Sequence, residues 1–231
     1  MIRALIVFLL FVPGLCSPAS GGAWLREDDT GFTAFSSTNR VPKDLSFLNS
    51  DNSFYVEYGV TGQTTLGADL NYATVWDGLD MLQEGHAILF LRRPIGRADR
   101  SMRFAYELGI GTRYRLLEWE GVLKLGLSMG KGIETGLGNG WIAVDGSVEF
   151  EDPSGGRLTK LDATFGISVS PRVKTMLQIQ SSYRSKDIYN VDVIPSIVWE
   201  LKPKSYMLLG VEARHSRTKT YGLKVGFWRD F

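Results

Sequence analysis

Few residues in this 231-residue chain have the side chains that catalysis most often uses. The chain contains two histidines, His86 and His215, and one cysteine, Cys16. His215 precedes Ser216 and could act as a base for that hydroxyl, or work with a carboxylate on a neighbouring strand. No spacing typical of zinc proteases, P-loops or EF-hands occurs. Both histidines fall near the ends of predicted strands, where a histidine is usually a solvated surface residue. We therefore expect no catalytic site, no metal site and no cofactor.

Charged residues form a second group with possible chemistry, because they recur on one side of a strict alternation. Residues two apart share one face of a strand, and in a closed sheet that face would line the lumen. The candidate pore-lining residues are Glu57, Asp69, Arg92, Arg103, Glu107, Lys124, Asp145, Glu149, Asp162, Asp192, Glu212, Arg214 and Lys224.

Two interpretations of these charges remain open. Opposed acidic and basic rows could orient small polar solutes, or the same charges could pair with one another and fill the lumen. The slight excess of acids argues against a dedicated anion channel.

The elements that must carry these residues are strands. Leu123, Leu125, Leu127 and Met129 alternate with Lys124, Gly126, Ser128 and Gly130, and this period of two is typical of strands with one apolar face. Similar patterns predict about twelve strands, at 31–38, 53–60, 64–73, 86–94, 101–114, 121–131, 140–150, 157–169, 173–184, 189–200, 205–216 and 219–231. Strands of roughly ten residues match a tilted transmembrane strand.

Alternation alone also fits a soluble barrel or sandwich. Here, however, the polar face is rich in Gly, Ser and Thr rather than Lys and Glu, which suits a crowded interior. Aromatic residues also map to both ends of the predicted strands, as expected of the girdles of membrane barrels. They are Tyr58, Trp199, Tyr206, Phe227 and Phe231 at one end, and Tyr72, Tyr114, Phe150, Tyr183 and Tyr221 at the other.

The N-terminus is typical of a cleaved secretory signal. Arg3 precedes the nine apolar residues ALIVFLLFV, which are too few to span a bilayer. Small residues follow, and cleavage is predicted after Ala19 or Ala23. The mature chain would then lack cysteine, which excludes a small disulfide-stapled domain. The segment WLREDDTGF (24–32) could plug the barrel mouth, but we expect a short lead-in to the first strand.

The final strand, YGLKVGFWRDF, resembles the C-terminal signature of Gram-negative outer-membrane β-barrel proteins. That signature is an alternating apolar strand ending in Phe, although Arg229 departs from it where an apolar residue is usual. In that family the assembly machinery is understood to read the last strand. The resemblance therefore implies an assembly signal made of Tyr221, Leu223, Val225, Phe227 and Phe231. The stretch FYVEYGVTGQTTLGADLNY also resembles a hairpin of small proteobacterial barrels with no assigned cargo.

Together, these features predict an all-β fold: a closed, antiparallel, up-and-down transmembrane barrel of about twelve strands, with a signal peptide at 1–23 and the barrel at 24–231. Both termini would lie in the periplasm, with short turns there and longer loops at 39–52 and 74–85 outside. Pro195 should cause a bulge or a local break, because proline lacks a ladder donor. Twelve tilted strands give a backbone radius of roughly 12 Å.

We expect this barrel to be a narrow pore for small polar solutes in the bacterial outer membrane. Its partners would be outer-membrane lipid and the barrel-assembly machinery, and the net charge of +1 gives no sign of nucleic-acid binding. The alternatives are a closed barrel with a structural or surface-interaction role through loops 39–52 and 74–85, an outer-membrane hydrolase, and a soluble periplasmic barrel.

Overall fold

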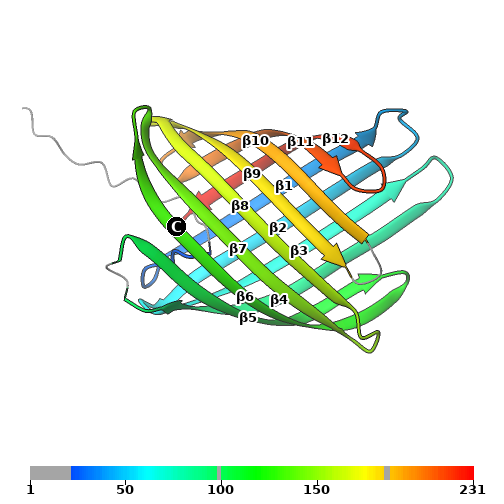
Figure 1. Cartoon of the computed structure of the whole chain (residues 1–231), viewed down its shortest axis with the longest axis horizontal. Helices are drawn as coiled ribbons and strands as arrows, with labels where there is room; N and C mark the ends of the chain where they lie inside the picture. Colours follow the sequence, from blue (N-terminus) through cyan, green and yellow to red (C-terminus); the bar gives the residue numbers. More distant parts are fainter. Residues whose placement is uncertain (1–21, 98–99, 185–187) are drawn as a thin grey trace, which may run out of the picture.

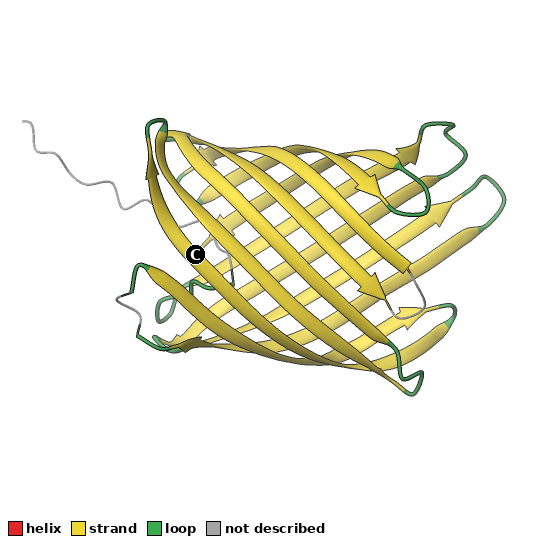
Figure 2. Ribbon diagram, viewed as in Figure 1, coloured by secondary structure: helices red, strands yellow, loops and turns green. Residues whose placement is uncertain are grey.

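The chain folds into one closed β-barrel (Figures 1 and 2). The computed structural model describes residues 22–97, 100–184 and 188–231, and within them it contains twelve strands and no helix. Each strand pairs antiparallel with its neighbours in the sequence, and the last strand pairs with the first. The strands are β1 (Gly31–Pro42), β2 (Leu48–Thr61), β3 (Thr64–Trp76), β4 (Met81–Ile95), β5 (Met102–Arg115), β6 (Glu118–Thr135), β7 (Gly138–Asp152), β8 (Arg157–Ser170), β9 (Val173–Arg184), β10 (Ile188–Lys202), β11 (Ser205–His215) and β12 (Thr220–Asp230). The predicted closed, antiparallel barrel of twelve strands is confirmed.

Within the residues described, no helix is long and apolar enough to cross a bilayer.

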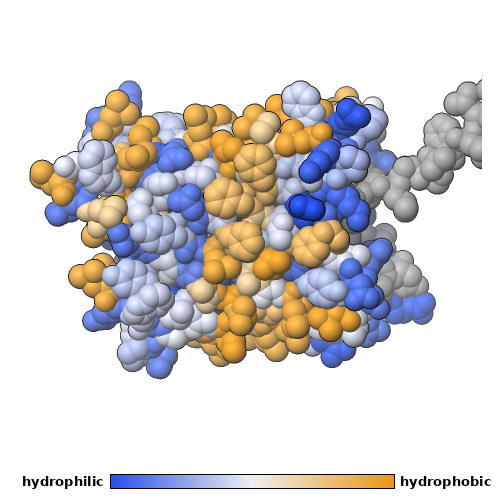
Figure 3. Space-filling view, turned by 180° about the vertical axis from the view of Figure 1, so that it is seen from behind, coloured by the Kyte–Doolittle hydropathy of each residue, from blue (hydrophilic) through white to orange (hydrophobic). Residues whose placement is uncertain are grey.

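The two faces of the sheet differ sharply in chemistry. Leu209 and Val225 on the outer face are 48% and 41% exposed, whereas Glu57 and Glu149 on the inner face are 1% and 0% exposed. An apolar band crosses the middle of the outer surface between two more polar edges (Figure 3). A band of this kind is costly in water and favourable in hydrocarbon. The predicted orientation, with apolar side chains outward and charged side chains inward, is confirmed.

The strands are longer than predicted at one end of the barrel. We call the end that holds Gly31 and Phe231 the proximal end, at the left of Figure 1, and the opposite end the distal end. The predicted long loops at 39–52 and 74–85 are wrong: the distal connections are only 43–47 and 77–80. Asn and Asp have low strand propensity, but pairing with neighbouring strands extends the ladder through them.

Aspartate side chains close both of these distal turns. The amide and hydroxyl of Ser46 donate to Asp44 at 3.2 and 2.9 Å, and the amides of Leu79 and Asp80 donate to Asp77 at 3.0 and 2.9 Å. These hydrogen bonds lower the pKa of both carboxyl groups, because they favour the charged form. Side chains thus supply the local structure of both turns.

Of the two outcomes predicted at Pro195, the bulge is wrong and the local break is correct. Pro195 is in register with Leu177 of β9, and the register with β11 is the same at Val193 and at Ser196. Only the pairing of Ile194 and Pro195 with β11 lapses. A missing N–H therefore interrupts the ladder on one side without adding a residue. The register shifts of the sheet lie beside proximal turns, at Gly59–Thr61, Ser168–Ser170 and Glu200–Lys202.

Most of the predicted aromatic residues point outward near the two ends of the barrel. Tyr58, Trp199 and Phe227 are exposed toward the proximal end, and Tyr72 and Tyr221 toward the distal end.

Tyr206 is the exception. It is in register with the inward Glu200, packs against the buried cluster at the proximal mouth, and has the ammonium of Lys174 5.2 Å from its ring centroid. The predicted parity of this strand is correct, with Leu208 and Glu212 inward and Leu209 outward, and Tyr206 shares the inward parity. Its assignment to an outer aromatic girdle is therefore wrong.

Candidate functional site

The proximal mouth of the barrel is filled by the N-terminal segment, residues 22–30, which we call the plug. Ala23 and Trp24 are 2% and 8% exposed. Both pack against Gly130, where a side chain would collide with the Trp24 ring. They join an apolar cluster contributed by the wall: Trp141, Ala143, Met176, Val198 and Leu208. The apolar core of this molecule therefore lies in the mouth of the barrel.

Arg26 ties the plug to the wall through charge. Its Nε lies 2.5 Å from Glu57 Oε1, and its Nη1 lies 3.3 Å from Asp230 Oδ1. Its guanidinium also stacks over the Phe32 ring at 4.5 Å, and its backbone amide donates to Thr65 Oγ1 at 3.0 Å. Of the two interpretations of segment 24–32, these contacts favour the plug over the short lead-in. The reason is that an apolar recess inside the mouth accepts Trp24.

Beyond the plug lies a polar cavity of about 280 Å³. Gly22 and Trp141 contribute to its proximal side, and Tyr55, Gln178 and Gln180 to its wall. Six of the candidate pore-lining residues also line it: Asp69, Arg92, Glu107, Lys124, Asp145 and Asp162.

The charges around this cavity pair along the wall. Arg92 bridges Glu57 and Glu107 at 2.8 and 2.7 Å, and Lys124 Nζ lies 2.8 Å from Glu107. Lys160 lies 2.8 Å from Glu149, which also pairs with Arg113. Each of these pairs joins two adjacent strands or two strands with one strand between them. The wall is therefore largely neutralised, and it shows no separate acidic and basic rows.

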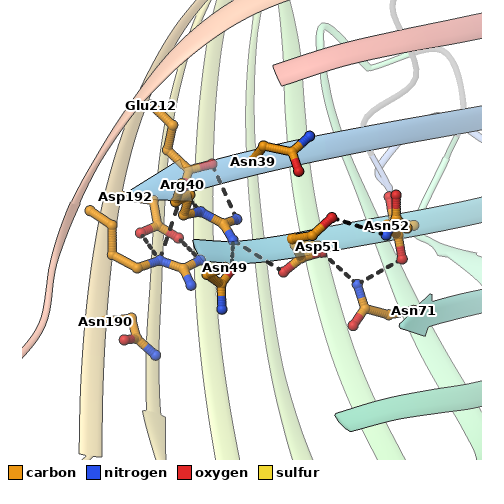
Figure 4. Close-up of polar contacts among 12 residues, drawn as sticks. Asn39, Arg40, Asn49, Asp51, Asn52, Asn71, Asn190, Asp192 and Glu212 are labelled. Carbon is orange, nitrogen blue, oxygen red and sulfur yellow. Dashed lines mark hydrogen bonds and ion pairs between the residues drawn. The ribbon is translucent and has the colours of Figure 1, made fainter. Parts of the chain in front are cut away.

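The distal half of the lumen holds a second polar network, drawn in Figure 4. Arg40 of β1 pairs with Glu212 of β11, and its Nη1 donates to Asn49 Oδ1 at 2.6 Å. Arg214 binds both carboxylate oxygens of Asp192, at 2.6 and 2.7 Å. Two-point Arg–carboxylate pairs of this kind fix geometry as well as charge.

Asp51 extends this network around the wall. It lies 3.6 Å from the Arg40 guanidinium and accepts from Asn71 Nδ2 at 2.8 Å. Figure 4 shows these side chains converging from β1, β2, β3, β10 and β11. Polar contacts thus cross-link strands on both sides of the β1–β12 closure.

The remaining candidate residues also lie on the inner face but make fewer ion pairs. Among the described residues, Asp145, Asp162 and Lys224 form no ion pair. Arg103 lies in a separate recess of about 880 Å³ at the proximal mouth, between the plug and the hairpin of β4 and β5. The predicted set is therefore shared between the central cavity, the distal network and this recess.

Sequence reasoning missed several inward charges: Arg26, Arg40, Arg113, Glu151, Lys160 and Arg184. Most are reachable by extending the same alternation, since Arg113 follows Glu107 and Lys160 precedes Asp162 by even spacings. Five of these six residues are basic, so the apparent excess of acids is reduced, although Asp51 and the buried Glu120 are missed inward acids as well. Arg26 could not be found this way, because it does not lie in a strand.

The histidines occupy different environments. His86 points inward, and its Nε2 lies 3.3 Å from Asp69 Oδ1. His215 points outward beside Tyr189, whose hydroxyl is 3.5 Å away, while Ser216 Oγ donates to the Thr218 carbonyl at 2.9 Å. The structure does not bring His215 and Ser216 together as a base and a nucleophile. Within the described part of the chain, no cluster of three His, Cys, Asp or Glu residues is arranged to hold a metal.

The last strand closes the ring at its final residue. Gly31 and Phe231 exchange two backbone hydrogen bonds, of 2.8 and 2.9 Å. Tyr221, Leu223, Val225, Phe227 and Phe231 all point outward from this strand and are exposed. Their accessibility is compatible with the predicted assembly signal, which stays a prediction.

Comparison with known proteins shows similarity in structure. No protein-family model matches the chain, and no curated protein matches its sequence. An outer membrane channel from Pseudomonas putida F1 is similar, with a TM-score of 0.63, 10% identity, and coverage of 92% of this chain and 99% of the channel. LpxR from Salmonella typhimurium matches with a TM-score of 0.58, 8% identity, and coverage of 86% and 99%. The KdgM porin matches with a TM-score of 0.55, 10% identity, and coverage of 86% and 99%. The chain therefore has the closed-barrel fold that these outer-membrane proteins share.

Proposed function

We propose that this protein is a bacterial outer-membrane barrel whose lumen is a narrow passage for small polar solutes, restricted at its proximal mouth by the plug. The apolar outer band supports a place in lipid, and the similarity to porins and channels supports the outer membrane. Under this proposal the proximal end faces the periplasm. The outer-membrane lipid and the assembly machinery are then its partners.

One observation carries the proposal: a polar cavity lies inside the wall, and the plug separates it from the proximal mouth. A barrel that served only as a scaffold has no need of a hydrated interior, and an apolar filling would cost less than buried charge. Most of the charges here are held in pairs along the wall, so they line the cavity without crossing it. Among the described lining residues, Asp145 and Asp162 are the exceptions without an ion pair. We therefore expect weak ion selectivity, because paired charges cancel at short range.

Planar-bilayer recordings test this proposal. The refolded mature protein should give small or infrequent current steps, and a variant lacking residues 22–30 should give steps several-fold larger. In a salt gradient, the reversal potential of the deletion variant should lie near zero. Absence of current from both proteins, each shown to be folded by its heat-dependent gel mobility, would contradict the pore.

A second candidate, a closed barrel, is favoured by the plug itself. Trp24 is buried and Arg26 forms two ion pairs with the wall, so the plug is anchored at both residues. The distal network cross-links the wall beyond the cavity. In that case the deletion should lower stability without opening a conducting path. The same recordings, run with an unfolding measurement on both proteins, separate the two candidates.

A further inference from the structure

An apolar groove of about 790 Å³ runs over the outer face of strands β8 to β12. Each of these strands contributes at least one outward side chain to it: Phe165, Leu177, Ile197, Leu209 and Val225. The groove also includes Pro195, where the pairing of β10 with β11 lapses. An aliphatic and aromatic lining of this kind favours a hydrocarbon chain over a polar solute.

Four exposed cations lie at the proximal end of the same strands. We call them the basic cluster: Arg172, Lys202, Lys204 and Arg229. Backbone hydrogen bonds connect the segments that carry them. The Asp230 amide donates to the Lys204 carbonyl at 2.9 Å, and the Glu200 amide donates to the Arg172 carbonyl at 2.8 Å. The cluster is therefore continuous from the turn between β8 and β9 to the end of β12.

The basic cluster has no acidic partner within the part of the chain that the structure describes. None of its four members forms an ion pair there. Asp230, which follows Arg229, belongs to the inner face and pairs with Arg26 at 3.3 Å. The positive charge of the cluster is thus available to an anion from outside the protein.

The groove and the basic cluster are spaced as the two parts of a lipid are. Val225, Phe227 and Arg229 share the outward face of β12, and the four residues from Val225 to Arg229 rise about 13 Å. One leaflet of a bilayer has a hydrocarbon depth of about 15 Å. Phe227 and Trp199 are exposed between the groove and the cluster, at the level where aromatic rings meet headgroups.

We propose that this surface binds one anionic phospholipid, with its phosphate on the basic cluster and an acyl chain in the groove. A guanidinium can hold a phosphate at two points, and an ammonium adds a point charge. Basic residues next to the hydrocarbon favour anionic over zwitterionic headgroups. This inference rests on the proposed place of the barrel in lipid but not on whether the lumen conducts.

Native mass spectrometry of the refolded mature protein tests the site. The protein is inserted into vesicles of phosphatidylglycerol and phosphatidylcholine in equal parts and then extracted in a mild detergent. We expect the barrel to retain a phosphatidylglycerol molecule in preference to phosphatidylcholine. Equal retention of the two lipids by inserted protein would overturn the site and leave the membrane proposal standing. Protein that stays outside the vesicles would instead contradict the proposed function.

The headgroup contact is tested by the double variant K204Q/R229Q. Each cation beside an anionic lipid contributes about fivefold in affinity, so this variant should bind phosphatidylglycerol more than about tenfold more weakly. The matched control is R217Q/K219Q, which removes two exposed cations from the distal turn of β11 and β12 and should retain lipid as the wild type does. Heat-dependent gel mobility shows that each variant is folded. An equal or larger loss in the control would overturn the proposed headgroup site.

The acyl-chain contact is tested by Val211→Trp, which fills the groove from β11. Val211 points outward, so the larger ring is tolerated by the wall but should lower lipid retention several-fold. Leu127→Trp, on the outer face of β6 away from the groove, is the control. Equal retention by these two variants would show that the groove holds no acyl chain. A wild-type spectrum dominated by a lipid-free dimer would assign the groove to a second copy of the chain and overturn the proposal.

Discussion

Arg40 and Glu212 form an ion pair although their strands, β1 and β11, are not neighbours. Strand β12 lies between them, and its residue at this level is Gly222, opposite Arg40 in the register. A side chain on Gly222 would lie 2.7 Å from Arg40 Cγ and 2.8 Å from the Asn39 carbonyl oxygen. The glycine therefore opens the path that lets Arg40 cross the last strand. This contact reinforces the seam at which the barrel closes.

We expect Glu212→Gln to destabilise the barrel by about 3 kcal/mol, because the buried Arg40 guanidinium then keeps only the more distant Asp51, at 3.6 Å, as a carboxylate partner. Arg40 and Glu212 side chains are 5% and 2% exposed, so water cannot replace the lost partner. Urea unfolding of the refolded protein in lipid measures the change. In the Glu212→Gln background, Arg40→Met should cost much less than it does alone. Arg217→Met, in an exposed distal turn, is the control and should change the free energy of unfolding little. Additive effects of Glu212→Gln and Arg40→Met would contradict the pairing.

Gly222→Ala should lower the free energy of unfolding by about 1–3 kcal/mol, since the new methyl group forces Arg40 or the β1 backbone to move. The same unfolding measurement applies. Gly132→Ala is a matched control on a strand, because nothing lies within 4 Å of the position of its new methyl group. A Gly222→Ala protein as stable as Gly132→Ala would show that Arg40 does not need this path.

Arg26→Ala should loosen the plug and raise the conductance of the barrel, because the segment loses its ion pairs to Glu57 and Asp230. Glu57 is 1% exposed and would be left with Arg92 as its cationic partner. The open time of single channels in planar bilayers is the measurement. Glu27→Gln alters an exposed residue of the same segment and should behave as the wild type. Indistinguishable recordings from all three proteins would mean that Arg26 does not hold the mouth closed.

Phe231→Ala should reduce the amount of folded barrel in the outer membrane several-fold if the last strand is the assembly signal. The heat-dependent gel mobility of membrane-fraction protein reports the folded share. Phe104→Ala is the control, because Phe104 is an outward-facing phenylalanine of similar exposure on β5. Equal losses in both variants would point to lost contact with lipid and would leave the signal without support.

The alternation of residue types determined much of the architecture. Because side chains in a strand alternate between two faces, the spacing from Leu123 to Met129 placed its apolar residues on one side and Lys124 on the other. The same parity placed all the candidate pore-lining residues on the inner face. It also holds at Tyr206, which shares the inward parity of Leu208. Tyr206 was expected to face outward only because it is an aromatic residue near a strand end.

Other features depend on partners that are far away in the sequence. The strands continue through Asn49 and Asp51 because β1 and β3 supply ladder partners on both sides. Pro195 causes no bulge because it stays in register with Leu177 of β9, and the pairing on that side does not need an N–H from Pro195. Local propensity is a weak guide at both places, since pairing with neighbours outweighs it.

By itself, then, the sequence determined a closed barrel with an apolar exterior and a charged interior, because those properties follow from a period of two and from the need to pair every backbone group in lipid. The tertiary structure alone decided that residues 22–30 enter the proximal mouth, because that depends on a recess between Gly130 and Trp141 which exists only after the ring has closed. It also decided which charges pair, since Arg40 and Glu212 are 172 residues apart and meet only where β12 has no side chain between them.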